Sequence, residues 1–408
     1  MTVLGSYDPD KPIHIYGAGM AGLFLGYFLK KNHIPFKIFE TSDRVGGKIS
    51  SQLTDYGLIE TAANAIVMND IIDEMLNDLK LRPIYARHGL KRIIFRQGKM
   101  KTYPLSLSDV LKIIPKLLKE IPVSAKSETA TVSDFFIPLL GADVVNEVLT
   151  PALSGIYASR ADELHLHSLF PSAATTKSYL DFILRFFKEN KKYKKKIKKF
   201  VSVSFEKGMG ELVNHLEKEL KEHLFLSTKK DLELSVNNII CTDTMQAAQL
   251  IPSLQNELNR IPYKKVLSAT IFTRREIPVL KKAFGALFAR GPEFKSLGVL
   301  NNFAIFNRAR QYPHYSYTFI SEVHALEHDY QKLTQHDLDE DVLLSQVKIW
   351  EKGIPVYNQQ RHQSINAIET ALDGKNILLF SHYTGSLSLR AMATSAYEFV
   401  ESIKDKAN

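Results

Sequence analysis

Three glycines near the N-terminus have the spacing of a dinucleotide-binding loop. They follow a short apolar run, 13–16, and open an expected helix, 20–31. In such a G-x-G-x-x-G loop the first glycine permits a tight turn, the second lets a pyrophosphate approach the backbone, and the third permits close packing of the helix. We expect cofactor contacts from the whole hexapeptide, which is Gly17, Ala18, Gly19, Met20, Ala21 and Gly22.

An acidic residue follows at the distance that this type of loop requires. Glu40 comes after a second apolar run, 36–39, about 20 residues beyond the loop, where its carboxylate can accept hydrogen bonds from ribose hydroxyls. The free amides at the start of helix 20–31 also favour phosphate. Together with Thr41, these residues predict a site for adenosine diphosphate, a moiety that NAD and FAD share.

Residues 44–48 indicate which of the two cofactors binds. Arg44-Val-Gly-Gly-Lys48 resembles the R-x-G-G-[RK] extension of the FAD-dependent amine oxidase superfamily. Paired glycines there bring backbone amides against the cofactor, and basic side chains neutralise its phosphates. The resemblance implies that FAD is bound by Arg44, Gly46, Gly47 and Lys48. It also implies non-covalent FAD, because the C-terminal region, where monoamine oxidases attach FAD, contains no cysteine.

Shorter segments along the rest of the chain are most similar to protoporphyrinogen oxidases, one branch of this superfamily. In chain order they are 58–64, 91–104, 151–171, 205–212, 298–308, 350–357 and 383–388. The resemblance implies that Asn64 lies near the flavin and the substrate and acts in catalysis. It further implies that Arg92 and Arg96 contact substrate carboxylates. Gly385 and Ser386 would belong to a turn beside the flavin.

Asn64, Arg92 and Arg96 also have a purely structural interpretation, as do two residues outside these assignments, His382 and Cys241. Asn64 fits a helix N-cap or a turn, and the two arginines fit the solvated face of a hairpin strand. His382 fits a packing residue, and Cys241 fits the core. The sequence also departs from the family pattern at the flavin-ring end. The departures are Ala62, Ala63, Lys207, the 380–382 segment, and the absence of an arginine after Pro104.

The distribution of apolar runs predicts the fold. Residues 13–39 form a β-α-β unit, 104–181 are mostly helical, and 265–323 contain short β-branched segments that suggest an antiparallel sheet. The predicted fold class is α/β, with a Rossmann-like FAD-binding domain and a substrate domain of antiparallel sheet plus a helical insertion. The predicted segments are 1–103, 205–262 and 361–408 for the FAD-binding domain, 104–204 for the helical insertion, and 263–360 for the substrate-domain sheet.

Charge and composition limit the partners. The 408 residues carry a net charge of +9, and no apolar run approaches the length of a membrane span. Eight lysines cluster as Lys188, Lys191, Lys192, Lys194, Lys195, Lys196, Lys198 and Lys199. This block leaves two interpretations open, a solvated face and a peripheral contact with an anionic membrane. We expect a cytoplasmic protein with one cysteine, no metal site and no nucleic-acid partner.

The combined features predict an FAD-dependent oxidoreductase. The enzyme would take a hydride from an apolar or aromatic small molecule and pass the electrons to O2. The family resemblance favours a protoporphyrinogen- or coproporphyrinogen-oxidase-like reaction. Two alternatives stay open: an amine-oxidase- or desaturase-type enzyme with another substrate, and a membrane-surface binding protein in which FAD is structural.

Overall fold

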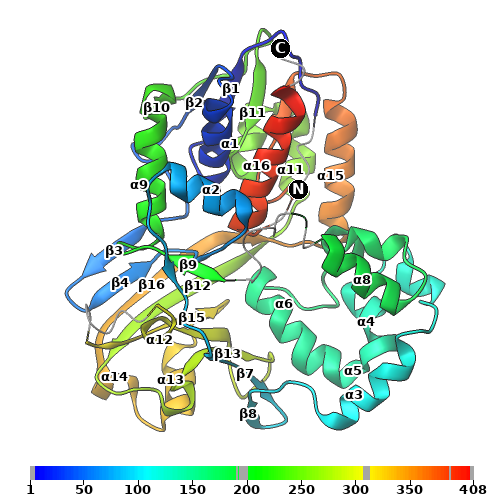
Figure 1. The fold of residues 1–408 in the computed structure, drawn as a ribbon, viewed down its shortest axis with the longest axis vertical. Helices are drawn as coiled ribbons and strands as arrows, with labels where there is room; N and C mark the ends of the chain where they lie inside the picture. The colour runs from blue at the N-terminus through cyan, green and yellow to red at the C-terminus, as the bar shows by residue number, and fades with distance from the viewer. Residues whose placement is uncertain (1–4, 190–191, 193–200, 307–312, 386, 405–408) are drawn as a thin grey trace.

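A five-stranded parallel sheet forms the upper part of the molecule in Figure 1. The computed structural model describes residues 5–189, 192, 201–306, 313–385 and 387–404, and the strands of this sheet come from distant parts of that chain. In spatial order they are β10 (Leu224–Phe225), β2 (Phe36–Phe39), β1 (Ile13–Tyr16), β11 (Asn237–Ile240) and β17 (Ile377–Leu379). All of the pairings are parallel, so the carboxyl ends of the strands meet at one edge.

Helices cover both faces of this sheet, which explains why most residues of its central strands β1 and β11 are buried. On one face lie α1 (Met20–Lys31), α2 (Asp70–Asp78), α9 (Met209–Leu220) and α16 (Leu389–Lys404). On the other lie α10 (Thr244–Leu250), α11 (Gln255–Arg260) and α15 (Gln359–Leu372). Ile15 packs in the first core and Tyr16 in the second, because successive strand residues point to opposite faces. The predicted Rossmann-like unit is confirmed.

A seven-stranded sheet lies below the first. Its strands, in spatial order, are β16 (Val342–Pro355), β12 (Tyr263–Thr273), β15 (Tyr315–Ser321), β14 (Ser296–Asn301), β13 (Ala283–Phe288), β7 (Lys91–Arg96) and β8 (Lys99–Lys101). The predicted antiparallel strands are present, and α12 (Asn302–Ile305), α13 (Leu326–Thr334) and α14 (Leu338–Asp341) accompany them. Only the β13–β7 pair is parallel among the pairings of this sheet's described strands.

Two features of the sheets differ from the sequence expectations. The hairpin of β7 and β8 falls in the segment 1–103 that we assigned to the FAD-binding domain, yet it extends the second sheet. Helix α9 ends at Leu220, and after the turn η5 (Lys221–His223) the chain forms the edge strand β10, which the sequence did not lead us to expect. Short strands complete the fold: β3 (Ser51–Thr54), β4 (Gly57–Glu60), β5 (Ile66–Val67), β6 (Ile84–Tyr85) and β9 (Ser202–Ser204). The domain boundaries as a whole stay a prediction.

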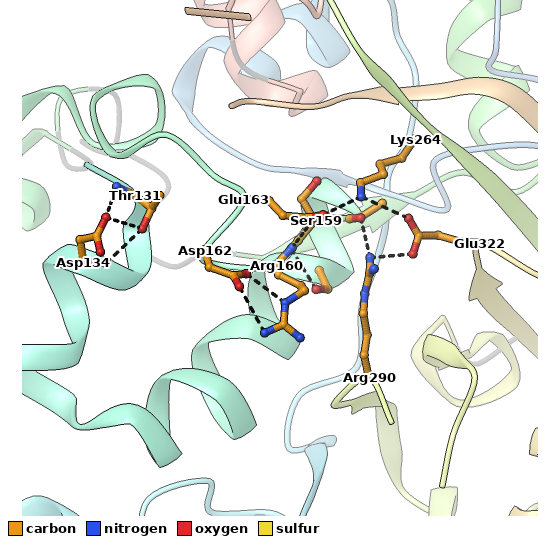
Figure 2. Close-up of polar contacts among 11 residues, drawn as sticks. Thr131, Asp134, Ser159, Arg160, Asp162, Glu163, Lys264, Arg290 and Glu322 are labelled. Carbon is orange, nitrogen blue, oxygen red and sulfur yellow. Dashed lines mark hydrogen bonds and ion pairs between the residues drawn. The ribbon is translucent and has the colours of Figure 1, made fainter. Parts of the chain in front are cut away.

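The predicted helical region lies beside the second sheet (Figure 1). Its helices are α3 (Leu107–Ile113), α4 (Val132–Leu140), α5 (Ala142–Val144), α6 (Thr150–Tyr157), α7 (Leu166–Leu169) and α8 (Tyr179–Glu189). Reciprocal capping boxes start α3 at Ser106 and α4 at Thr131, and Figure 2 shows the Thr131–Asp134 pair. Phe135 and Tyr179 lie at the centre of a separate apolar core.

Ion pairs join this helical region to the second sheet, as Figure 2 shows. Glu163 follows α6 and pairs with Lys264 of β12 at 3.0 Å. Arg290, just after β13, pairs with Glu322 at 2.7 Å and also donates to the carbonyl oxygen of Ala158 at 2.7 Å. These contacts hold the end of α6 against the sheet. In the part of the chain that the structure describes, no helix has the length and apolar character of a membrane span.

Candidate functional site

The glycine-rich loop adopts the conformation that its sequence predicts. Gly17 has a φ of +102° and its amide donates to the carbonyl oxygen of Phe39 at 2.8 Å. A Cβ on Gly22 would lie 2.0 Å from the carbonyl oxygen of Gly17, so a side chain there is incompatible with this backbone. The first and third glycines are therefore needed to place the start of α1 directly after β1.

The second glycine faces open space. A Cβ on Gly19 would meet no atom within 4 Å. Gly19 is the N-cap of α1, no side chain caps this end, and the first turn contains no acidic residue. The amides of Met20, Ala21 and Gly22 begin the helix, where backbone donors have no intrahelical acceptor. This arrangement fits a pyrophosphate group.

The loop 44–48 lies against the glycine-rich loop. The amide of Gly46 donates to the carbonyl oxygen of Ala18 at 2.8 Å, and a Cβ on Gly47 would lie 3.3 Å from the Cα of Gly19. Gly46 and Gly47 have φ values of +93° and +59°, which favour glycine. The side chain of Arg44 folds over its own loop and donates to the carbonyl oxygen of Gly47 at 2.6 Å.

Glu40 is oriented by the two loops around it. One carboxylate oxygen accepts a hydrogen bond from the amide of Ala18 at 2.8 Å, and the other accepts one from the amide of Ser42 at 2.9 Å. Thr41 is exposed beside it. The structure thus brings the predicted adenosine diphosphate contacts together at the carboxyl ends of β1 and β2, where ligands bind in open α/β sheets.

Lys48 connects the cofactor loops to the second sheet. Its ammonium donates to the carbonyl oxygens of Lys352 and Gly353, the latter at 2.7 Å, and burial lowers its pKa to about 8. On the same strand, the indole N–H of Trp350 donates to the carbonyl oxygen of Thr61 at 2.8 Å. Strand β16 therefore closes one side of the site. Sequence reasoning placed its residues in the substrate-domain sheet but did not predict this contact with the cofactor loops.

Asn64 lies three residues beyond Thr61, in the segment between β4 and β5. It is half-buried, and no hydrogen bond of its side chain occurs among the described residues. It is not a helix cap, because Asn69 caps α2 by accepting from the amide of Ile72 at 2.9 Å. The structure leaves Asn64 available for a ligand contact near the cofactor loops.

The turn after β17 supplies buried polar groups that sequence reasoning did not select. Nε2 of His382 and the hydroxyl of Tyr383 are buried without a hydrogen-bond partner among the described residues. Burial and the charge of Lys48 lower the pKa of His382 to about 3, so its imidazole is neutral near pH 7. Gly385 follows and is half-buried, whereas the predicted contact Ser386 lies outside the described residues.

A buried arginine lies behind this turn. Arg361 is 4% exposed, donates through Nε to the carbonyl oxygen of Tyr383 at 2.8 Å, and has its guanidinium 4.2 Å from the ring centroid of Tyr357. It forms no ion pair with a carboxylate of the described residues, and its pKa is lowered, chiefly by burial. Sequence reasoning did not select Arg361, which follows the family-like segment 350–357 by four residues. Cys241 is buried, which raises the pKa of its thiol, as expected for a core residue.

The acidic residue Glu60 has a structural role. Its carboxylate accepts from the amide of Met209 at 2.8 Å, at the start of α9, and from the hydroxyl of Ser51 at 2.6 Å. Gly208 keeps the positive φ of +80° that this turn needs, so the departure at Lys207 leaves the turn intact. A cavity of about 530 Å³ lies between Arg44, Ser51 and α9, and Lys207 is one of the residues that line it.

The structure does not bring Arg92 and Arg96 to the cofactor loops. Their strand, β7, lies five strands from β16, which corresponds to roughly 24 Å at about 4.8 Å per strand. Arg96 is buried and pairs with Asp109 at 2.7 Å and Glu147 at 2.9 Å. Arg92 is exposed, with its guanidinium 5.4 Å from the ring centroid of Phe284. The geometry therefore argues against both as ligands of a substrate that reacts at the cofactor loops.

Comparison with known proteins identifies the family. Residues 20–230 match the model of the family described as flavin containing amine oxidoreductase. The chain belongs to this family. The match confirms the resemblance found in the sequence, and with it the flavin cofactor and the oxidoreductase class. Among the described residues, no three His, Cys, Asp or Glu side chains are grouped as metal ligands.

Curated relatives include oxidases of two porphyrinogens. The chain is 26% identical over 242 residues to coproporphyrinogen III oxidase from Staphylococcus aureus, covering 52% of each protein. It is 22% identical to the chloroplastic protoporphyrinogen oxidase of Nicotiana tabacum, with 95% of this chain and 84% of the relative covered. The chain thus aligns with about half the length of the coproporphyrinogen oxidases it matches.

Solved structures share the fold along the whole chain. A protein from Exiguobacterium sp. 255-15, named for protoporphyrinogen oxidase, has a TM-score of 0.75 at 17% identity and covers 98% of this chain and 100% of its own. Reduced UDP-galactopyranose mutase has a TM-score of 0.70 at 14% identity, covering 98% of this chain and 96% of its own. These neighbours confirm the predicted fold class. Because their names differ in the reaction, the fold does not select one.

Proposed function

We propose that this member of the family is an FAD-dependent oxidase of a porphyrinogen. The observation that carries the proposal is the joined pair of cofactor loops, in which Gly46 bonds to Ala18 beside the open face of Gly19. The curated relatives support the substrate class, because they are named for the oxidation of coproporphyrinogen and protoporphyrinogen.

The residues of the chain fit FAD in a defined order. The start of α1 and the 44–48 loop bind the diphosphate, and Glu40 binds the ribose of the adenosine end. When bound, FAD supplies the acceptor for a hydride from a substrate C–H bond. Lys48, His382 and Tyr383 line the other end of the site, and Asn64 orients the substrate there. Half-buried Lys48 and its contacts to β16 help to exclude water.

A porphyrinogen suits the chemistry of the site. Its reacting carbon is electron-rich, so hydride loss needs no strong base, and His382 is neutral and poorly basic. The substrate's pyrrole proton leaves to solvent when the hydride has departed. We further propose O2 as the second substrate, which is reduced to hydrogen peroxide by the two electrons and two protons released.

The remaining proposals concern where the protein is located and which second function it could have. We propose a cytoplasmic location, which the single cysteine suits, and a peripheral contact with an anionic membrane. Most of the lysine block lies outside the described residues, apart from exposed Lys188 and Lys192, which pairs with Glu398 at 2.8 Å. The second candidate function is an amine-oxidase- or desaturase-type reaction, favoured by the fold shared with enzymes of other names.

Anaerobic reduction of the bound flavin tests the function. Protein with full FAD occupancy is mixed with protoporphyrinogen or coproporphyrinogen, and flavin absorbance and porphyrin fluorescence are followed together. Bleaching within seconds to minutes, followed by recovery and peroxide formation when O2 is admitted, supports the proposal. A Gly19→Val variant that lacks flavin is the matched control for spontaneous oxidation. Failure of both porphyrinogens to bleach the flavin would exclude this substrate class, and bleaching by amines would favour the second candidate.

A further inference from the structure

One face of the seven-stranded sheet is directed toward the cofactor loops, and Trp350 of β16 identifies it. The indole N–H of Trp350 donates to the carbonyl oxygen of Thr61, directly after β4, at 2.8 Å. Alternate residues of a strand share a face, and so do residues paired directly across two strands. Trp350 pairs with Val266 of β12, and Lys348 pairs with Ser268. We call the side of the sheet that carries these four side chains the cofactor-side face.

Lys348 is an unneutralised cation on the cofactor-side face. Its Nζ lies 4.7 Å from the ring centroid of Trp350, and it forms no hydrogen bond or ion pair with a described residue. The neighbouring acid, Glu351, follows Trp350 directly, so it lies on the opposite face, where it pairs with Lys265 at 2.8 Å. A second charge at the indole is also positive, because Nζ of Lys48 lies 5.9 Å from the same centroid. This part of the face therefore attracts an anion.

Other cations near the cofactor loops have different roles. The ammonium of Lys48 donates to two backbone carbonyls of β16. Arg361 is buried behind the turn that follows β17, where it donates to the carbonyl oxygen of Tyr383. The arginines that the sequence suggested as carboxylate ligands lie on the distant strand β7. Lys348 has no such engagement, so its ammonium is available to a ligand.

The position of Lys348 at the solvent edge suits a carboxylate. Strand β16 is the edge strand of its sheet, next to β12 (Figure 1), and Lys348 is exposed. An ionised carboxylate loses several kcal/mol of hydration when it is buried, so a substrate with an apolar ring keeps its carboxylates at the rim of a site. Lys348 lies two residues from Trp350, which is roughly 7 Å at about 3.4 Å per residue. It can therefore meet a carboxylate of a ligand whose ring lies beside Trp350.

We propose that Lys348 binds a carboxylate of the substrate at the rim of the flavin site. The proposal rests on the porphyrinogen oxidation proposed above, and it gives Lys348 the role that the sequence assigned to Arg92 and Arg96. The contact lies away from the reacting carbon and is the same before and during hydride transfer. It therefore sets the affinity for substrates with ionised carboxylates and leaves the rate of the chemical step unchanged.

Steady-state oxidation of coproporphyrinogen by the FAD-loaded protein tests the contact with three variants. Lys348→Gln should raise KM about tenfold and leave kcat within about twofold, because a charge-assisted hydrogen bond contributes equally to ground and transition states. Lys348→Arg keeps the charge and should hold KM within about threefold of wild type. Lys265→Gln is the matched control, since it removes one lysine from the opposite face of the neighbouring strand, and it should change neither constant.

Trp350 allows binding to be measured without turnover. It is the only tryptophan of the chain, so its fluorescence reports a porphyrin that binds beside it. Titration of the FAD-loaded protein with coproporphyrin, the oxidised product, gives a dissociation constant, which should rise about tenfold in Lys348→Gln. The methyl ester of coproporphyrin has no ionised carboxylate, and its dissociation constant should be the same in wild type and variant.

Several results would overturn the assignment of Lys348. These are an unchanged KM and dissociation constant in Lys348→Gln, an equal loss of affinity for the methyl ester, or a rise in KM in Lys352→Gln instead, further along β16. Each of them leaves the oxidation of porphyrinogens by wild type in place. Failure of the wild-type flavin to be bleached by coproporphyrinogen or protoporphyrinogen overturns the proposed function itself, and the role of Lys348 with it. The wild-type measurement alone thus separates the two failures.

Discussion

The amide of Gly46 donates to the carbonyl oxygen of Ala18 at 2.8 Å, and this hydrogen bond joins two loops that are separated in the sequence. The bond places Gly47 against Gly19 at the start of α1. Together the loops create one surface of backbone donors and basic side chains, so the diphosphate and the rest of the cofactor are bound by a single unit. The first two predictions test that unit.

Gly19→Val should abolish flavin retention while the fold is kept. Its Cβ would enter open space, and Gly19 has φ −68° and ψ 178°, which any residue adopts. Blocking the diphosphate removes charge-assisted hydrogen bonds worth about 3 kcal/mol, which corresponds to roughly a hundredfold in the dissociation constant of FAD. Titration of flavin-free wild type and of the variant with FAD measures this dissociation constant. Gly22→Ala is the contrasting variant, and it should destabilise the protein itself by about 2 kcal/mol. Normal flavin content in Gly19→Val would refute the assignment of this loop.

The purified protein should be yellow and should release intact FAD when denatured. The only cysteine, Cys241, is buried in the core, where burial raises the pKa of its thiol and leaves it unreactive. Acid precipitation followed by chromatography of the supernatant measures the release. Flavin that stays with the precipitated chain, or recovery of NAD alone, would contradict non-covalent FAD.

Lys48 should make the stability of the flavin-free protein depend on alkaline pH. Its folded pKa of about 8 lies below the value of about 10.4 in an unfolded chain, so the unfolded state binds more protons between these values. Stability should therefore rise from about pH 8 to about pH 10.4 relative to a Lys48→Met variant, by on the order of 1 kcal/mol for each pKa unit. Urea unfolding of both proteins across this range measures the difference, and parallel pH profiles would show that the ammonium is not buried.

Arg96→Gln should lower stability more than activity. The change leaves Asp109 and the partly exposed Glu147 without their cation, at a cost of about 3 kcal/mol. Pairing lowers the pKa of Asp109, so this contribution is present above about pH 4 and is lost as the pH falls further. The difference in unfolding free energy between wild type and variant should shrink accordingly in acid. A constant difference down to low pH would show that the ion pair is not its cause.

Arg92→Gln should leave the KM for a porphyrinogen within about twofold, because β7 lies far from the cofactor loops. Steady-state oxidation at saturating O2 gives KM and kcat, and Asn64→Ala is the comparison expected to lower kcat. A large rise in KM for Arg92→Gln with kcat unchanged would restore this arginine as a ligand of a substrate carboxylate.

Local sequence determined the cofactor-binding unit. The spacing of Gly17, Gly19 and Gly22 and the apolar runs around them follow from short-range rules, because a tight turn and a strand-to-helix transition need particular residues at fixed offsets. The acid at position 40 and the paired glycines 46 and 47 belong to the same local pattern. The Rossmann-like unit and the flavin cofactor could therefore be predicted before the structure was known.

Tertiary structure alone decided which remote residues reach that unit. Strand β16 is a polar edge strand with an irregular apolar pattern. The contacts of Lys48 with Lys352 and Gly353 could therefore not be predicted from the sequence. Arg92 and Arg96 lie on the same face of β7, yet only Arg96 is buried, where it meets the carboxylates of Asp109 and Glu147. Likewise, periodicity identifies an apolar face of α3, but only packing determines that this face points to solvent, because burial depends on which other elements lie against the helix.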